Sequence, residues 1–325
     1  MNSTLRNFVA GVGAAAMMAG LATSASAAGY PDKPITFVVG FSAGGFADSV
    51  ARIVGEQVNK KLGQPVVVDN KPGAASNIAA QAVAGAKPDG YTVLVSTTSV
   101  AINASLYKKL NYSLTKDLVP VAVAVRAPET FSAKPGSAKT LKDFIDAAKK
   151  KRLTFGSAGV GSGSHLTWFY FFHNIAKVNA VHVPYKGGAP AMQAAMGGQV
   201  DGFAATASGH TVSQLVKGGK LTCLAVAAPE RYRRLPDCPT LAEAGYPNVY
   251  GSSWVAFWVP KGTPADVIAK LNGAINSIAE NKPAAAKLMQ NGDLMHFKPA
   301  AAEKFVNDEV ATWAERVKAS GAAVQ

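Results

Sequence analysis

The stretch from residue 35 to residue 62 constrains the fold of this chain more than any other. Its β-branched and aromatic run, Ile35 to Val39, predicts a buried strand. A loop with the adjacent glycines Gly44 and Gly45 follows, and then an apolar spacing that is typical of an amphipathic helix. Asp48 is expected to cap that helix at its N-terminus. A strand, a glycine loop and a helix N-terminus in this order expose main-chain N–H groups, and they predict an anion site made of backbone.

Strands and helices alternate along the rest of the chain, which favours an α/β fold with a parallel sheet. A second glycine- and serine-rich segment, GSAGVGSGSHL at residues 156–166, again follows a predicted strand and opens a predicted helix. Both loops come at the carboxyl ends of strands, where open α/β sheets bind their ligands. The repeated pattern predicts two lobes with a cleft between them.

Residues 1–27 have the pattern of a secretory signal peptide. Arg6 precedes an apolar stretch, and the small residues Ala25-Ser26-Ala27 fit a cleavage site. The apolar stretch is too short for a membrane span, and no later run reaches 18 apolar residues without a charge. We therefore expect an exported, soluble chain that begins near Ala28.

The sequence carries 33 Lys and Arg against 20 Asp and Glu, a formal net charge of +13. A solvated surface with excess lysine accounts for this charge, and a positive field that attracts anionic ligands is the alternative. Because an exported chain without an aromatic and basic motif is a poor candidate for binding nucleic acid, we expect no such partner.

Cys223 and Cys238 are the two cysteines of the chain. In an oxidising compartment an even pair favours a disulfide over two buried thiols. No histidine lies near them at ligand spacing, so a metal site is not expected.

Enzymatic interpretations are weaker. The residues from Gly40 to Gly44 match the nucleophile elbow G-x-S-x-G with Ser42 as nucleophile, but they follow the first strand, whereas an elbow normally follows several strands. His165 could act as a base, or as a ligand hydrogen-bond donor or structural cap. Asp201 could be a catalytic acid or a carboxylate that anchors a loop. No dinucleotide or phosphate motif is complete, so no cofactor is expected.

Nearly the whole mature sequence resembles Bug-type periplasmic solute receptors of the tripartite tricarboxylate transporter system. The blocks that carry the resemblance occur in the family's order: YPDKPITFVVGFSAGGFAD, LGQPVVVDNKPGAASNIAA, KPDGYTVLV, GSAGVGSGSHL, VHVPYKGGAPAM, GGQVDGF and LPDCPTLAEAGYP. The resemblance implies a type II-like periplasmic-binding-protein fold (a Venus flytrap), with residues 28–127 and 251–325 in the first lobe and residues 128–250 in the second.

The resemblance also implies a function. A periplasmic monomer would capture a small carboxylate without metal or cofactor and deliver it to integral-membrane permease subunits. A receptor that serves a signalling protein, and an exported serine hydrolase, remain alternatives. Carried over residue by residue, the ligand-binding set is Phe41, Ser42, Ala43, Gly44, Gly45, Phe46 and Asp48 in the first loop, Ser157, Gly161, Ser162, Gly163, Ser164 and His165 in the second, Tyr185, Lys186 and Gly187 in the YKG block, Thr97, Thr98 and Asn77 near the mouth of the cleft, and Asp201.

The opening loop departs from the family pattern. Gly40, Ser42 and Ala43 replace prolines, and Phe46 replaces a small residue. Phe46 either forms a flat wall for an aromatic dicarboxylate, such as a benzene dicarboxylate, or points into the core. Arg126, a lone cation in an apolar run, either pairs with a ligand carboxylate or points to solvent.

Overall fold

The computed structural model describes residues 29–208 and 212–322. The predicted signal peptide, residues 1–27, lies outside these ranges. Met1–Tyr30 is one unit of the chain, and Pro31–Gln325 is a second, compact unit that contains all the elements discussed below. Within the described ranges, no helix combines the length and the apolar character that a membrane crossing requires.

The strands of the second unit belong to one mixed sheet. They are β1 (Ile35–Val39), β2 (Val66–Asn70), β3 (Thr92–Thr97), β4 (Leu118–Ala133), β5 (Leu153–Ser157), β6 (Ala180–Pro184), β7 (Gly202–Thr206), β8 (Thr222–Val226), β9 (Ser252–Pro260) and β10 (Asp293–Leu294). The α-helices are α2 (Phe46–Leu62), α3 (Asn77–Ala84), α4 (Ser99–Leu106), α5 (Leu114–Asp117), α6 (Leu141–Lys150), α7 (Gly163–Tyr170), α8 (Gly188–Met196), α9 (Gln214–Lys217), α10 (Ala265–Asn276), α11 (Lys282–Met289) and α12 (Pro299–Ser320). Short 3₁₀ or π segments are η1 (Ala74–Ser76), η2 (Phe171–Ile175) and η4 (Ser277–Ala279).

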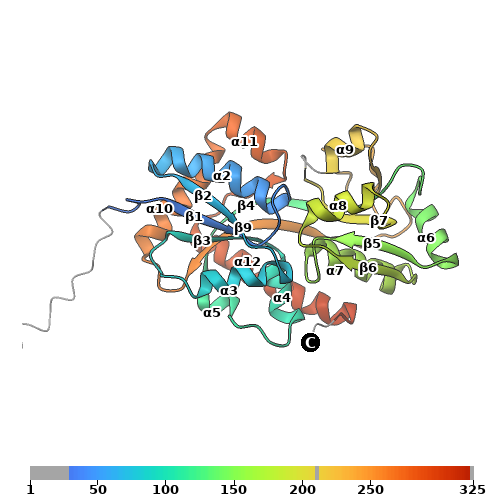
Figure 1. The fold of residues 1–325 in the computed structure, drawn as a ribbon, viewed down its shortest axis with the longest axis horizontal. Helices are drawn as coiled ribbons and strands as arrows, with labels where there is room; N and C mark the ends of the chain where they lie inside the picture. The colour runs from blue at the N-terminus through green and yellow to red at the C-terminus, as the bar shows by residue number, and fades with distance from the viewer. Residues whose placement is uncertain (1–28, 209–211, 323–325) are drawn as a thin grey trace, which may run out of the picture. The chain divides into compact units, whose positions relative to one another are not determined.

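The sheet has ten strands, and its main path runs β2-β1-β3-β9-β4-β7-β5-β6. Figure 1 labels the strands of this path. β1 pairs in parallel with β2 and β3, and β5 pairs in parallel with β6 and β7. Between these parallel groups, β4 and β9 run antiparallel to their neighbours. The α/β class expected from the sequence is therefore present, but the sheet is mixed rather than purely parallel.

The long strand β4 links the two parallel groups. It pairs with β9 as far as Pro128 and with β7 from Glu129 onward. The N–H of Glu129 also donates to the carbonyl of Gly251, 2.9 Å away, where the chain returns toward β9. The predicted lobe boundaries, 127/128 and 250/251, fall where β4 changes partner and where the chain returns toward β9. The division into lobes stays a prediction, because the chain from Pro31 onward forms one unit.

Helices cover both faces of the sheet, so each strand buries side chains in two directions. One core gathers residues of α3, α4 and α12 around Trp254 and Trp258. α2, α10 and α11 pack together on the opposite face (Figure 1). A further core surrounds Phe131, whose ring centroid lies 5.0 Å from that of Phe172 and 5.1 Å from that of Trp168. Such aromatic pairs contribute about 0.5–1.5 kcal/mol each beyond the free energy of burying their surface. These pairs hold β4, the strand that carries Phe131, in place.

The prediction that Asp48 caps α2 is wrong. The helix begins at Phe46, its N-cap is Gly45, and no side chain caps it. Gly44, in the left-handed region at φ +78°, turns the chain into the helix before Asp48 is reached. The last turn ends on Gly63 at φ +74°, a common way for a helix to stop.

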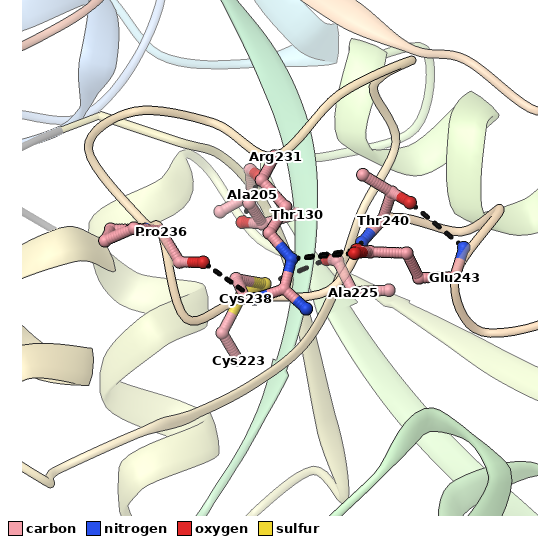
Figure 2. The surroundings of a disulfide bond; sticks show 9 residues. All are labelled: Thr130, Ala205, Cys223, Ala225, Arg231, Pro236, Cys238, Thr240 and Glu243. Carbon is pink, nitrogen blue, oxygen red and sulfur yellow. Dashed lines mark hydrogen bonds and ion pairs between the residues drawn. A yellow bond between two sulfur atoms is a disulfide. The ribbon is translucent and has the colours of Figure 1, made fainter.

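A disulfide joins Cys223, on β8, to Cys238 in the following loop; their Cα atoms are 5.4 Å apart (Figure 2). The same loop carries an ion pair in which the Arg231 Nε donates to Glu243, 2.8 Å away. Glu243 also accepts from the N–H of Thr240 at 2.7 Å. These links close a loop that has no regular structure of its own.

Candidate ligand-binding site

A cavity of about 40 Å³ lies where three helices begin. Its lining includes the first residues of each helix: Gly45, Phe46 and Ala47 at α2, Ser162, Gly163 and Ser164 at α7, and Gly188 at α8. The remaining lining residues are Phe41, Thr97, Glu129, Ala158, Phe203, Ala205, Thr206, Ser208 and Ser253. Since about 10–15 Å³ suffices for one water, this space holds about three. Helix N-termini carry partial positive charge, so their convergence makes the cavity suited to an anion.

The first loop presents main chain to the cavity. N–H groups in the first turn of a helix have no acceptor within the helix, and no side chain caps α2. Ala43 is exposed at the tip of the loop and does not line the cavity, whereas Phe41 is buried and does. The part of the loop that faces the cavity is therefore Gly45 to Ala47, together with Phe41.

Asp48 holds this loop from behind. Its carboxylate accepts from the N–H of Gly44 at 2.8 Å, from Arg52 at 2.9 Å and from the Asn70 amide at 3.0 Å. Burial acts to raise the pKa of Asp48, but these hydrogen bonds outweigh it and hold the pKa below the usual value. Because all of these donors are protein groups and Asp48 does not line the cavity, it positions the loop.

Ser42 joins the first loop to the YKG block. Both its N–H and its hydroxyl donate to the carbonyl of Lys186, at 3.1 and 3.0 Å. In the part of the chain that the structure describes, the hydroxyl bonds to no histidine, so no nucleophile–base pair forms there. Tyr185 and Lys186 line a neighbouring pocket instead, and the adjoining Gly188 reaches the cavity.

The second loop is ordered by its own serines. The Ser162 hydroxyl caps α7 by accepting from the N–H of His165 at 3.1 Å, and it donates to the carbonyl of Gly159 at 2.7 Å. The Ser164 hydroxyl lies 3.1 Å from that of Ser162. Gly161 has φ +89°, and a Cβ there would meet the Asn103 amide oxygen at 2.0 Å, so only glycine fits.

His165 lies behind this loop rather than in the cavity. Its Nδ1 accepts from the N–H of Gly161 at 3.3 Å, and its ring centroid is 4.0 Å from that of His182. His182 in turn bonds to the Ser157 hydroxyl at 2.6 Å. Burial first, and the neighbouring histidines second, hold the pKa of His165 well below its ordinary value. His165 is therefore neutral and acts as a structural anchor, and Ser157 likewise faces His182.

Two of the three polar residues expected near the mouth of the cleft, Thr98 and Asn77, bond to other parts of the protein. Thr97 does line the cavity, but the Thr98 hydroxyl accepts from the N–H of Trp254 at 3.0 Å. The Asn77 amide oxygen accepts from Tyr112 and Asn103, at 2.9 and 3.0 Å. Neither Thr98 nor Asn77 lines the cavity.

Asp201 is a loop anchor. Its carboxylate accepts from the N–H and the hydroxyl of Thr154, at 2.8 and 3.0 Å, near the start of β5. The cavity lies beyond the other end of that strand, so a role for Asp201 in binding or acid catalysis does not fit the structure. Arg126 also points away: its Nε donates to Ser252 at 2.8 Å, and its guanidinium lies 3.9 Å from Glu309.

Phe46 is shared between the cavity and an apolar core, and its role toward an aromatic ligand stays a prediction. It lines the cavity, and it also packs against the apolar core formed around Phe203. Phe41 and Phe203 add two further aromatic walls. The cavity is therefore largely apolar, with main-chain donors at its helix ends.

The sequence reasoning missed Glu129, the one titratable side chain among the described lining residues. It is fully buried on β4, and its Oε1 accepts from the Thr206 hydroxyl at 3.3 Å. Its Oε2 has no hydrogen-bond partner. Burial raises the pKa of Glu129 to about 8, and the hydrogen bond from Thr206 offsets only part of this rise. The one acid in β4, a strand that is mostly apolar, was the signal that could have found it.

Within the described ranges, no three His, Cys, Asp or Glu side chains gather in a way that could hold a metal ion.

The comparisons with known proteins all point to one family of binding receptors. The model of the tripartite tricarboxylate transporter family receptor matches residues 50–322. Protein BugT of Bordetella pertussis is 34% identical over 332 residues, which cover 99% of each chain. The solved structure of the periplasmic binding protein BugD is 34% identical, covers 91% of this chain and 100% of its own, and superposes with a TM-score of 0.86. The structure of R. palustris Rpa4515 with adipate is 30% identical, covers 90% and 99%, and has a TM-score of 0.85.

Proposed function

The chain belongs to the tripartite tricarboxylate transporter receptor family, and on that basis we propose that it captures a small dicarboxylate in the cavity between its glycine loops. It is a periplasmic solute-binding protein and not an enzyme, because the family consists of binding receptors. The hydrolase alternative is therefore set aside, in agreement with the bonding of Ser42 to the Lys186 carbonyl.

The observation that carries this proposal is the convergence of three helix N-termini on one cavity. Gly45, Ser162 and Gly188 lie at the starts of α2, α7 and α8, which in the chain are far apart. Main-chain N–H groups at these ends bind a carboxylate without a basic side chain. The adipate in the related R. palustris structure supports a dicarboxylate as the ligand.

Capture would involve closure around the ligand. A ligand shifts a conformational equilibrium only through its differential affinity, so an acid that touches both loops favours the form in which they meet. The bonds from Ser42 to Lys186 join the first loop to the YKG block in this structure. A cavity with room for about three waters must widen to admit a six-carbon acid. A closed, ligand-bound receptor would then dock on the membrane permease.

The structural setting of Phe46 leads to a narrower proposal on ligand class. Three phenylalanines border the cavity, so a flat aromatic dicarboxylate would gain contacts that a flexible aliphatic one lacks. The proposal also holds that the chain is exported, that a signal peptide is cleaved after residue 27, and that the protein acts as a monomer.

Thermal unfolding of the purified exported protein tests this function. The panel contains adipate, malate, terephthalate and benzoate, with glucose as an uncharged control. A ligand that binds the native state adds about 2.7 kcal/mol of stability at 100 times its Kd, so a true ligand raises the melting temperature clearly. If no carboxylate in the panel stabilises the protein, the proposal fails. If only aliphatic acids do, the aromatic preference fails alone.

A matched pair of variants locates the site. Gly188→Asp adds a carboxylate at the cavity, where a Cβ meets nothing within 4 Å, so it repels an anionic ligand without crowding the fold. Gly273→Asp makes the same change of charge at an exposed position of α10 that is equally open. We expect the first variant alone to lose the ligand-induced stabilisation.

A further inference from the structure

Glu129 lines the cavity, and only one of its two carboxyl oxygens has a hydrogen-bond partner. Its Oε1 accepts from the Thr206 hydroxyl at 3.3 Å, whereas its Oε2 is buried and has no hydrogen-bond partner. The backbone on both sides is fixed, since β4 pairs Glu129 with Thr206 and the Glu129 N–H donates to the carbonyl of Gly251. A buried polar atom without a partner is costly, so a free Oε2 at a ligand cavity indicates that the ligand supplies the partner.

The fold also leaves room for this carboxyl group. Gly163 is the first residue of α7, and a Cβ there would lie 2.7 Å from the Glu129 Oε1. Any other residue at position 163 would displace the carboxyl group from the cavity wall. Glycine at the helix start and glutamate on β4 thus form one complementary pair.

The groups around Glu129 leave it uncharged near neutral pH. Burial raises the pKa of Glu129 to about 8, and the facing strands β7 and β9 carry no charged side chain. On the facing helices, His165 is neutral because burial lowers its pKa, and Asp48 and Arg52 are paired with each other. Since Oε1 accepts from Thr206, the proton lies on Oε2, the carboxyl oxygen of this lining residue that has no hydrogen-bond partner.

We propose that Glu129 is the specificity-determining residue for the second carboxylate of the ligand, to which its Oε2–H donates a hydrogen bond. The inference rests on the proposed function, in which the first carboxylate is held by the helix N-termini. A bond from a neutral acid to a carboxylate is charge-assisted and stronger than a bond between neutral groups. A monocarboxylate leaves Oε2 without its partner, and binding of the dicarboxylate requires the proton on Glu129.

Isothermal titration calorimetry tests this with three ligands of matched length: adipate, hexanoate and 6-aminohexanoate. Each is measured at pH 7, 8 and 9 against the wild-type protein, Glu129→Gln and Glu129→Ala. For the wild type we expect adipate to bind at least tenfold more tightly than hexanoate. Its affinity then falls by about tenfold per pH unit once the pH exceeds the pKa of Glu129, because the proton must be taken up again.

The two variants distinguish the hydrogen-bond donor of Glu129 from its ability to ionise. Glu129→Gln keeps a donor that does not titrate, so it retains the preference for adipate and loses the pH dependence. Glu129→Ala loses the preference itself while it still binds hexanoate. Melting temperatures of both variants that lie no more than a few degrees below the wild-type value show that the fold is intact.

Several results would overturn the inference. Tightest binding of 6-aminohexanoate would mean that Glu129 acts as an anion toward a cationic group. Equal binding of adipate and hexanoate by the wild type, or an unchanged ratio in Glu129→Ala, would remove Glu129 from recognition while carboxylate capture still stands. Absence of binding by both adipate and hexanoate would instead refute the proposed function, and the inference with it.

Discussion

Replacing Glu129 by glutamine should stabilise the ligand-free protein at neutral and alkaline pH, because glutamine cannot ionise when the chain unfolds. The buried carboxyl group has a pKa of about 8 in the folded protein, against 4.5 as the ordinary value. In the unfolded chain it ionises freely in water above the lower value, which favours unfolding. The stability that the wild type draws from the protonated acid is therefore complete below about pH 4.5 and is lost as the pH rises toward about 8.

The size of the effect follows from the same two pKa values. One pKa unit corresponds to about 1.4 kcal/mol, so the difference between 4.5 and about 8 sets a ceiling near 5 kcal/mol. The helix ends that border the cavity act in the other direction, because each favours a negative charge by about 0.3–1 kcal/mol. We expect the stability of Glu129→Gln relative to the wild type to rise by about 2–4 kcal/mol between pH 5 and pH 8.

Urea unfolding at pH 5, 6, 7 and 8 measures this difference. Glu303→Gln, which removes an exposed carboxylate from α12, is the matched control and should show no comparable trend. A constant offset between Glu129→Gln and the wild type is compatible with the argument, since glutamine leaves its own donor without a partner. A difference that does not change with pH would refute the reasoning, because it would mean that Glu129 ionises alike in both states.

Three further predictions rest on other parts of the fold. Cys223→Ala/Cys238→Ala opens a loop of 15 residues and should cost about 3 kcal/mol in urea unfolding, an effect that vanishes when the wild type is measured under reducing conditions. Gly161→Ala forces a Cβ to within 2.0 Å of the Asn103 amide oxygen at φ +89°, so its melting temperature should fall, and an unchanged value would contradict this close approach of the loop to Asn103. Raising the salt concentration should slow ligand association in stopped-flow measurements more than it changes dissociation. The reason is that the positive net charge of the sequence lies outside a cavity that has no basic lining residue among those described.

The parts of the site that the sequence predicted are those that depend on neighbours in the chain. A strand, a glycine loop and a helix start follow one another between Ile35 and Phe46, and again between Leu153 and Gly163. Local patterns therefore suffice to place Gly45 and Ser162 at a cavity. Asp48 shows the limit of this reasoning. Residue type favoured it as a cap, but the left-handed Gly44 starts the helix earlier and leaves Asp48 to accept from its N–H.

The parts that the sequence did not reveal depend on strand pairing across long separations. Glu129 reaches the cavity because β4 lies between β7 and β9, and Gly188 reaches it because the YKG block meets Ser42. Neither contact leaves a periodic signal in the chain. Asp201 failed for the same reason: its family block was recognised, but the pairing of β5 with β7 places it at the opposite end of the strand from the cavity.

The combination of helix ends with one neutral acid explains why a binding site for an anion needs no lysine or arginine here. A basic side chain in the cavity would pair with Glu129, hold it ionised and remove the donor that faces the ligand. Main-chain dipoles attract the carboxylate without bringing a mobile cation, and they leave the proton on Oε2 as long as burial outweighs their own pull. The absence of basic residues among the described lining residues is thus the condition under which Glu129 can distinguish one carboxylate from two.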